Sequence, residues 1–286
     1  MRKSLLITGA SSGLGIATAI QAAGAGYSVH ATMRDPGKRA ALDQAAAAAG
    51  VKVQVHAMDV CDPASVAAAV AAVIATEGQI DALVANAGIG FVRTTEQATA
   101  ADIDLVMQTN FMGVVHCVKS VLPHMRQARH GHIVAISSVG GLVGQPFNEI
   151  YCASKFAVEG YIESLATYVG PAFGLQFSLV EPGGILSEFA NSALRHFNET
   201  GGMIEDEYLP VIGRYMAARQ NRADGIFQTA DQVAGVVVAC LQSATPPLRV
   251  RTSDWAEKFC ALKTVGDPDG LALRAQVVSQ MLGGMD

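Results

Sequence analysis

The sequence has few charged residues and no cluster of charge. Charged side chains make up 16% of its 286 residues while half of the residues are apolar, a composition that excludes disorder over most of the chain. The formal net charge is −5, and the basic residues are scattered without forming a run. Because nucleic acids and anionic membrane surfaces are bound by basic clusters, we expect neither among the partners of this protein.

The cysteines lack the arrangement that marks a disulfide scaffold or a metal centre. Their number is odd, no two are spaced as Cys-x-x-Cys, and they stand at positions 61, 117, 152, 240 and 260. We therefore expect reduced thiols in a cytoplasmic protein, most of them small core residues, and no metal site.

Long apolar runs are also missing. No stretch approaches the ~18 consecutive apolar residues of a membrane-spanning helix. The start of the chain has two basic residues followed by an apolar run, but glycines interrupt that run early, so we do not interpret it as a signal peptide. The sequence predicts no membrane span.

Apolar runs of strand length alternate with longer helical segments. The runs that predict strands lie at residues 4–8, 27–33, 51–58, 80–88, 132–138, 174–184 and 248–252. The segments that predict helices lie at 13–25, 37–49, 62–78, 99–128, 151–170 and 230–243. This alternation predicts one α/β domain over residues 1–286, a doubly wound (Rossmann) parallel sheet of about seven strands with helices on both faces. Residues 185–229 and 253–286 do not fit it and are interpreted as a substrate-lid insertion and a C-terminal tail.

A glycine-rich turn, residues 8–15, follows the first predicted strand and opens the first helix. Glycines at the spacing G-x-x-x-G-x-G let the backbone approach a pyrophosphate, and the helix N-terminus supplies amide donors. The spacing departs from G-x-G-x-x-G, and a plain tight turn between a strand and a helix also accounts for it. With its strand and helix context, the turn favours a dinucleotide site made by Gly9, Ser11, Ser12, Gly13, Leu14 and Gly15.

The end of the second predicted strand bears on which dinucleotide is bound. An acidic residue there would hold the ribose hydroxyls of NAD, but Met33 occupies that place and Arg34 follows it. A guanidinium suits a 2′-phosphate, and Ser12 could donate a further hydrogen bond, so we expect NADP(H). Asp35 complicates the interpretation, because it could reach the ribose or pair with Arg34, and Arg34 could also be an ordinary surface residue.

Small and polar residues follow the next two predicted strands. Asp59 and Val60 follow the third strand, where a carboxylate would meet an adenine amino group, although Asp59 could equally cap a helix. The fourth strand ends in Asn86, Ala87 and Gly88, which are small enough for a cofactor to lie across the strand ends. Since open α/β sheets bind ligands at these ends, we predict cofactor contacts at all five positions.

Three side chains suggest proton chemistry in the same crevice. Tyr151 and Lys155 are one helical turn apart, and Ser138 ends the fifth predicted strand. A tyrosine that titrates near ~10 would need its pKa lowered by ~3 units to act near neutral pH, and an adjacent ammonium supplies part of that shift. Strand alternation sends Ser137 and Ser138 to opposite faces, so only one of them is expected to serve. A packed tyrosine and a solvated lysine are the ordinary alternatives.

Taken together, these motifs resemble the short-chain dehydrogenase/reductase family. The resemblance rests on TGASSGLG, the Asn-Ala-Gly at 86–88, Asn110, Ser138 and Tyr151-x-x-x-Lys155, in family order over about residues 3–250. Within the single-domain branch, the segment SVGGLVGQPFNEIYCASKFAVEGYIESLA is most similar to the 17β-hydroxysteroid and retinol dehydrogenase group.

The resemblance implies a role for each matching residue. Tyr151 would be the general acid in reduction and the general base in oxidation, Lys155 would lower its pKa and bind the nicotinamide ribose, and Ser138 would polarise the carbonyl. Asn110 would hold a water that links Lys155 to solvent. Nicotinamide contacts are implied for Pro182, Gly183, Ile185 and Ser187. Ser187 stands where the family usually has threonine, which makes the Ser187 contact less certain. Ala85 stands where many members have asparagine. Pairing of helices near 103–126 and 151–170 would give a homodimer or homotetramer.

The expected function is therefore an NADP(H)-dependent oxidoreductase of a ketone or secondary alcohol. The long lid favours a bulky lipophilic substrate, although its apolar residues also suit ordinary packing. A non-catalytic NADPH-binding sensor or scaffold remains an alternative, and so does a nucleotide-sugar epimerase or dehydratase with a similar tyrosine–lysine pair.

Overall fold

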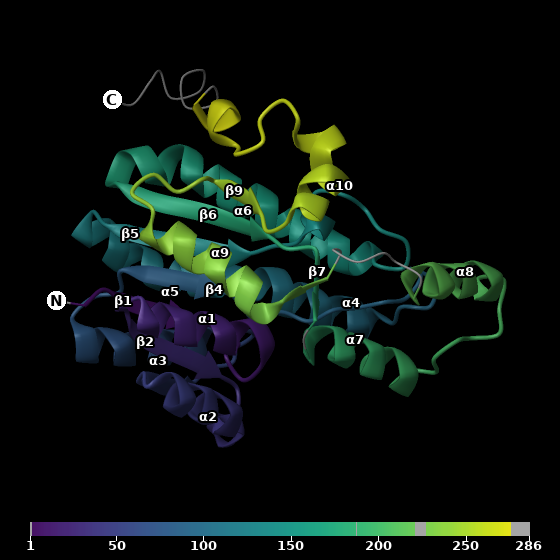
Figure 1. The fold of residues 1–286 in the computed structure, drawn as a ribbon, viewed down its shortest axis with the longest axis horizontal. Helices are drawn as coiled ribbons and strands as arrows, with labels where there is room; N and C mark the ends of the chain where they lie inside the picture. The colour runs from purple at the N-terminus through teal and green to yellow at the C-terminus, as the bar shows by residue number, and fades with distance from the viewer. Residues whose placement is uncertain (1, 187, 221–226, 276–286) are drawn as a thin grey trace.

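A seven-stranded parallel sheet forms the centre of the molecule (Figure 1). The structure is a computed structural model that describes residues 2–186, 188–220 and 227–275, so the predicted contact at Ser187 lies outside the described residues. The strand order is β3-β2-β1-β4-β5-β6-β9. The strands are β1 (Ser4–Ile7), β2 (Ser28–Met33), β3 (Val53–Ala57), β4 (Ala82–Ala85), β5 (Gly131–Ile136), β6 (Leu175–Glu181) and β9 (Arg249–Arg251).

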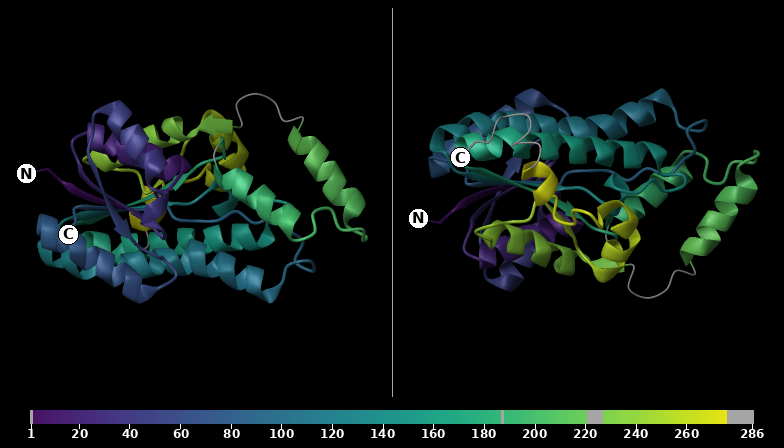
Figure 2. Two further views of the ribbon diagram at one scale, coloured as in Figure 1. Left: turned by 90° about the horizontal axis from the view of Figure 1, so that it is seen from below. Right: turned by 90° about the horizontal axis from the view of Figure 1, so that it is seen from above.

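Helices cover both faces of this sheet, as Figure 2 shows. One layer holds α1 (Gly13–Gly24), α2 (Ala40–Ala49) and α9 (Ala230–Gln242). The other holds α3 (Pro63–Glu77), α5 (Gly113–Ala128) and α6 (Glu149–Phe173). The predicted doubly wound fold, its seven strands and its two helical layers are confirmed.

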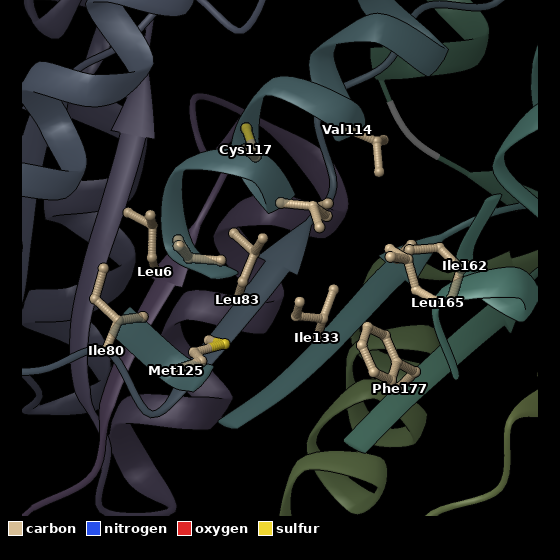
Figure 3. Packing of buried hydrophobic residues seen from close by; sticks show 14 of the residues in the cluster. Leu6, Ile80, Leu83, Val114, Cys117, Met125, Ile133, Ile162, Leu165 and Phe177 are labelled. Carbon is tan, nitrogen blue, oxygen red and sulfur yellow. The ribbon is translucent and has the colours of Figure 1, made fainter. Parts of the chain in front are cut away.

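Strand alternation divides the apolar residues between two hydrophobic cores. Leu5 and Ile7 of β1 pack against α1 and α9, while Leu6 between them packs on the opposite face. Leu83 and Ile133 join Leu6 in the second core, which Figure 3 shows from close by. Because both of its faces are buried, the central strand β4 (ALVA) is apolar throughout, whereas the edge strands β3 (VQVHA) and β9 (RVR) alternate with polar residues.

Helix ends follow the sequence signals at several places. Asp62 caps α3, since its carboxylate accepts a hydrogen bond from the Ala64 amide at 2.9 Å, and Pro63 occupies the first helical position. The predicted helix at 37–49 is instead divided into a 3₁₀ turn (Pro36–Lys38) and α2. Asp35 caps that turn.

The helical region predicted at 99–128 is interrupted once. It consists of α4 (Ala100–Met107), a π-helical turn at Gln108–Met112, and α5. Within the described residues, Ala100–Ala128 is the one helix long and apolar enough to cross a membrane, by length and composition only. Its α5 part packs in the core against the sheet, as helices of soluble domains do, so it is weak support for a membrane span.

Residues 188–220 and the start of the C-terminal tail lie beyond the carboxyl ends of the strands, whereas residues 265–275 run back along the sheet, where the Asp269 carbonyl accepts a hydrogen bond from the Arg249 amide at 3.0 Å (Figure 1). A short strand β7 (Gly184–Leu186) pairs with β8 (Phe227–Thr229) in a second, unpredicted sheet. Two helices, α7 (Glu188–Glu199) and α8 (Leu209–Gln220), come between them in the chain. After β9, α10 (Asp254–Thr264) packs against the turn at Val139–Gly141. All five cysteines are free.

Truncation of Leu83 should destabilise the fold far more than truncation of an exposed leucine. Leu83 is fully buried, so Leu83→Ala removes contacts and leaves a cavity that costs ~2–5 kcal/mol of unfolding free energy. Leu262 in α10 is fully exposed, so Leu262→Ala is the matched control and should change stability by less than about 0.5 kcal/mol. Urea denaturation of both variants tests this, and equal losses would contradict the assigned core.

Candidate active site

A cavity of about 590 Å³ opens at the carboxyl ends of the strands. It lies where the strand order reverses between β1 and β4, the switch point at which open α/β sheets bind ligands. The structure brings almost all of the predicted site residues to its wall: Gly9, Ser11, Ser12, Gly13, Leu14, Gly15, Arg34, Asp59, Val60, Asn86, Ala87, Gly88, Ser138, Tyr151, Lys155, Pro182, Gly183 and Ile185. Among the described residues, only Asn110 of the predicted set does not line the cavity.

The glycine turn is packed too tightly for side chains. A Cβ on Gly15 would lie 2.3 Å from the Gly9 carbonyl oxygen, and one on Gly9 would lie 2.8 Å from the Ala87 Cα atom. Gly9 also has a φ of 68°, a left-handed conformation that favours glycine. The turn therefore keeps its backbone bare toward the cavity.

The N-terminus of α1 faces the same cavity. Ser12 is the N-cap residue, but its side chain makes no capping hydrogen bond, and Ser12, Gly13 and Leu14 all line the wall. A helix start of this kind offers backbone amides and a positive dipole end to an anion. Bare glycines and an uncapped helix start fit the pyrophosphate of a nicotinamide dinucleotide.

The end of β2 resolves the alternatives left open for Asp35. The Asp35 carboxylate accepts a hydrogen bond from the Gly37 amide at 2.9 Å and so caps the 3₁₀ turn. Among the described residues it neither lines the cavity nor forms an ion pair with Arg34. Arg34 is exposed at the cavity wall, and Met33 before it is buried.

Asp59 lines the cavity but does not cap α3, and its contact with an adenine amino group remains a prediction. Its Oδ1 accepts a hydrogen bond from the Cys61 amide at 2.9 Å in the turn before α3, yet Asp59 also lines the cavity. The capping of α3 itself belongs to Asp62.

Tyr151, Lys155 and Ser138 converge at the other end of the cavity. The Lys155 ammonium donates a hydrogen bond to the Ile136 carbonyl at 2.9 Å and lies 5.9 Å from the centroid of the Tyr151 ring. The Ser138 hydroxyl accepts a hydrogen bond from the Gly140 amide at 3.0 Å. Ser137 also lines the cavity, and its hydroxyl lies beside Gly141, where an added Cβ would be 2.7 Å from it.

The ionisation of Tyr151 runs opposite to the predicted direction. Burial raises the pKa of Tyr151 to about 12, against a smaller lowering by its hydrogen bond with Ser138. Burial also lowers the pKa of Lys155 to about 8, against the opposing charge of Glu159. In the protein itself, desolvation therefore outweighs the effect predicted for the ammonium, and Tyr151 is a neutral phenol near pH 7.

Asn110 lies behind the cavity wall rather than on it. Its Oδ1 accepts from the Ile89 amide at 2.7 Å, and its Nδ2 donates to the Ile89 carbonyl at 2.9 Å and to the Ser154 hydroxyl at 3.1 Å. These bonds brace the loop after β4 against α6. The role of Asn110 in holding a water remains a prediction.

Some cavity residues were not predicted as site residues. The Phe189 ring of α7 lies 6.0 Å from the Tyr151 ring, between centroids. Trp255 of α10 also lines the cavity, so the start of the C-terminal tail contributes to the site of its own chain. In the same wall, His196 Nε2 lies 3.2 Å from Asp102 Oδ1, within hydrogen-bond distance. Their sequence separation gave no signal that they would meet.

Comparison with known proteins places this chain in a family. The sequence profile described as short chain dehydrogenase matches residues 3–197. The chain is 42% identical to retinol dehydrogenase 8 from Bos taurus over 274 residues, 94% of this chain and 86% of that protein. It is 35% identical to human 17-beta-hydroxysteroid dehydrogenase type 1 over 277 residues, 94% and 83% of the two chains.

A solved structure shows the same fold. A short-chain dehydrogenase from Streptomyces avermitilis superimposes with a TM-score of 0.76 at 28% identity, covering 100% of this chain and 99% of that one. The chain belongs to the short-chain dehydrogenase family, which confirms the resemblance seen in its motifs. It is accordingly an oxidoreductase of alcohols and ketones that uses a nicotinamide cofactor.

Addition of one methyl group at Gly15 should disrupt the dinucleotide site. Because the new Cβ would meet the Gly9 carbonyl at 2.3 Å, Gly15→Ala must displace the turn, and we expect NADPH to bind roughly tenfold more weakly or worse. Gly24 ends the same helix with nothing within 4 Å of its Cβ position, so Gly24→Ala is the matched control. Calorimetric titration with NADPH measures both, and unchanged affinity in Gly15→Ala would count against this site.

Proposed function

We propose that the protein is an NADP(H)-dependent oxidoreductase that interconverts a bulky lipophilic ketone and its secondary alcohol. The observation that carries the proposal is that Tyr151, Lys155 and Ser138 line the same cavity as the bare glycine turn. Proton-transfer groups and a dinucleotide cradle are thus parts of one site, which is the arrangement that hydride exchange with a carbonyl requires.

Each polar group in the site has a separate task. A nicotinamide cofactor, when bound, would supply or accept the hydride. Tyr151 gives its proton to the carbonyl oxygen during reduction, for which a phenol with a raised pKa is in the correct state at neutral pH. Ser138 orients that oxygen by a hydrogen bond from a hydroxyl that need not ionise. The ammonium of Lys155, fixed by the Ile136 carbonyl, favours the phenolate that remains.

The preference for NADP(H) is supported by the end of β2. Arg34 is exposed at the cavity wall, where its guanidinium can bind a 2′-phosphate. Asp35 is committed to capping the 3₁₀ turn, and Met33 supplies no carboxylate, so no acidic side chain of this segment is set to bind the two ribose hydroxyls.

The preference for a lipophilic substrate is supported by the lid. Residues 185–229 are assigned as the lid because their Phe189 faces Tyr151 and several of them line the cavity. Two relatives are named as dehydrogenases of retinol and of a hydroxysteroid. Both of these compounds are lipophilic alcohols, which supports the assignment.

We also propose that the protein is a cytoplasmic homodimer or homotetramer. Support comes from large apolar side chains exposed on the helices predicted to pair, namely Leu105 on α4 and Phe156 and Tyr168 on α6. Burial of such side chains against a second copy would remove apolar surface from water.

Removal of the Tyr151 hydroxyl should abolish turnover and leave cofactor binding intact. Tyr151→Phe keeps the ring but has no proton to give, so kcat/KM for a ketone should fall by ~10²–10⁴-fold while the NADPH dissociation constant is unchanged. Tyr161→Phe on the same helix is the matched control, since Tyr161 does not line the cavity. Full activity in Tyr151→Phe would refute the mechanism. Binding of NADPH with no turnover by the unmodified protein across a ketone panel would favour the sensor alternative.

Loss of the Arg34 guanidinium should selectively weaken the use of NADPH. Because the lost contact is charge-assisted, Arg34→Ala should lower kcat/KM for NADPH about tenfold or more and leave that for NADH unchanged. Arg39 lies nearby in a surface ion pair with Asp43, so Arg39→Ala controls for loss of a positive charge. Steady-state assays with both cofactors decide this, and equal or better efficiency of the unmodified protein with NADH would overturn the preference.

A further inference from the structure

Two buried carboxyl groups lie behind the cavity wall. Glu159 of α6 and Glu181 at the end of β6 are 5% and 0% exposed. Glu159 follows Lys155 by one helical turn, and Ser137 lies close by, because a Cβ on Gly141 would be 2.7 Å from the Ser137 hydroxyl oxygen and 3.2 Å from Glu159 Oε1. Neither glutamate lines the cavity, so any effect on the reaction must pass through a neighbouring residue.

Each carboxyl group uses one oxygen to bind an arginine of β9. Arg249 Nε lies 3.3 Å from Glu159 Oε2, and Arg251 Nη1 lies 3.1 Å from Glu181 Oε2. The other oxygen of each group, Oε1, is buried and has no hydrogen-bond donor among the described residues, since Arg249 Nε is 3.7 Å from Glu181 Oε1. Two ionised carboxylates cannot satisfy each other, because each only accepts hydrogen bonds. One hydrogen held between the two groups would give both a partner.

The charges around the pair also favour one bound proton. Glu163 of α6 and Glu257 of α10 bind the outer sides of the two arginines, with Nη2 of Arg249 at 2.8 Å and Nε of Arg251 at 3.0 Å. With Lys155, three cations thus face four carboxyl groups in the part of the chain that the structure describes. The two outer carboxylates are partly exposed, so the uncompensated negative charge falls on the buried pair. A proton bound there removes the cost of that charge.

The shared hydrogen belongs mainly to Glu181. Burial and the charge of Glu159 raise the pKa of Glu181 to about 8. Burial raises the pKa of Glu159 too, but the Ser137 hydroxyl opposes that rise, as does hydrogen bonding with Glu181. Cys260 of α10, which faces the same cluster, is a neutral thiol because burial raises its pKa to about 11. With Glu181 as the acid, Glu159 keeps its negative charge beside Lys155.

We propose that Glu159 and Glu181 hold one proton between them and release it at alkaline pH before Lys155 loses its own. The second negative charge then stabilises the Lys155 ammonium, because opposite charges favour each other's ionised state. The carboxyl pair is thus a positioning group that extends the pH range in which Lys155 is charged. This inference rests on the proposed function, in which that ammonium favours the Tyr151 phenolate, and deepens it by naming the residues that keep the charge.

NMR with ¹³C at glutamate Cδ and lysine Cε measures both protonation events without turnover. In the unmodified protein, one glutamate carboxyl group should still be protonated at neutral pH and should lose its proton before Lys155 does. The Lys155 signal is assigned by its disappearance in Lys155→Met. Ionisation of every glutamate at neutral pH would overturn the inference, and this arm needs no variant of the pair.

Two variants test the effect on Lys155. Glu159→Gln removes the charge one turn away, so the midpoint of the Lys155 titration should fall by about one pH unit, a tenfold change in proton affinity. Glu181→Gln keeps Glu159 but stays neutral at every pH, so the midpoint should fall by a smaller amount. An unchanged midpoint in Glu181→Gln would show that the shared proton does not support Lys155 and would overturn the inference.

Glu163→Gln is the matched control for a merely structural role. It removes a carboxylate that binds the same arginine as Glu159, at 2.8 Å, but Glu163 lies two helical turns from Lys155. Loss of the contact with β9 alone would affect both variants alike, whereas Glu163→Gln should not lower the Lys155 midpoint. An equal fall in Glu163→Gln and Glu159→Gln would contradict the positioning role.

The measurements separate this inference from the proposed function. The NMR titrations decide the shared proton and its effect on Lys155 whether or not the protein reduces a ketone. The alkaline limb of kcat/KM for ketone reduction with NADPH should follow the Lys155 titration in each variant, which supports the inference when it does. A limb that ignores a measured shift of Lys155, or no reduction of any ketone, would count against the proposed function and leave the carboxyl pair as the titrations define it.

Discussion

The hydroxyl of Thr8 is the contact on which the cavity depends. It accepts hydrogen bonds from the Asn86 and Ala87 amides at 2.9 and 2.8 Å, while the Asn86 side chain donates to the Thr8 carbonyl at 2.8 Å. These bonds join the glycine turn after β1 to the end of β4. A side chain on Gly9 would push the glycine turn away from the end of β4. Gly88, two residues after Asn86, lies against Asn110 and near Lys155. The cofactor half and the catalytic half of the site are therefore held by one junction.

Buried charged side chains behind the site also affect the ionisation of Lys155. Glu159 lies one helical turn after Lys155, and its charge opposes the lowering of the Lys155 pKa by burial. Burial and the neighbouring Glu159 raise the pKa of Glu181 to about 8, while Arg251 binds Glu181 at 3.1 Å and Arg249 reaches Glu159 at 3.3 Å. Burial raises the pKa of Glu159 and Arg249 opposes that rise, so the last strand of the sheet favours the ionised form of the carboxylate beside Lys155.

Local patterns predicted the fold and much of the site wall because those features depend on neighbours in sequence. Apolar strands, the glycine turn and the spacing of Tyr151 and Lys155 are all set within a few residues. The predicted direction of the shift in the Tyr151 pKa was wrong, because desolvation depends on everything packed around the phenol. The same limit applies to Asp35, whose capping role depends on how the chain turns after β2, and to the pairing of β7 with β8.

Helix α7, in the segment proposed as a substrate lid, is held against the body of the protein at two places. Gly90 faces α7 so closely that a Cβ there would lie 2.9 Å from the Ala193 Cβ. The bare backbone at Gly90 therefore sets how close α7 lies to the loop after β4. Arg93 fixes the end of the same helix through backbone carbonyls. Ala193 and Phe189 also line the cavity, so a larger side chain at position 193 would move the helix, whereas the contacts of Arg93 with backbone carbonyls do not depend on the side chains that α7 turns toward the cavity.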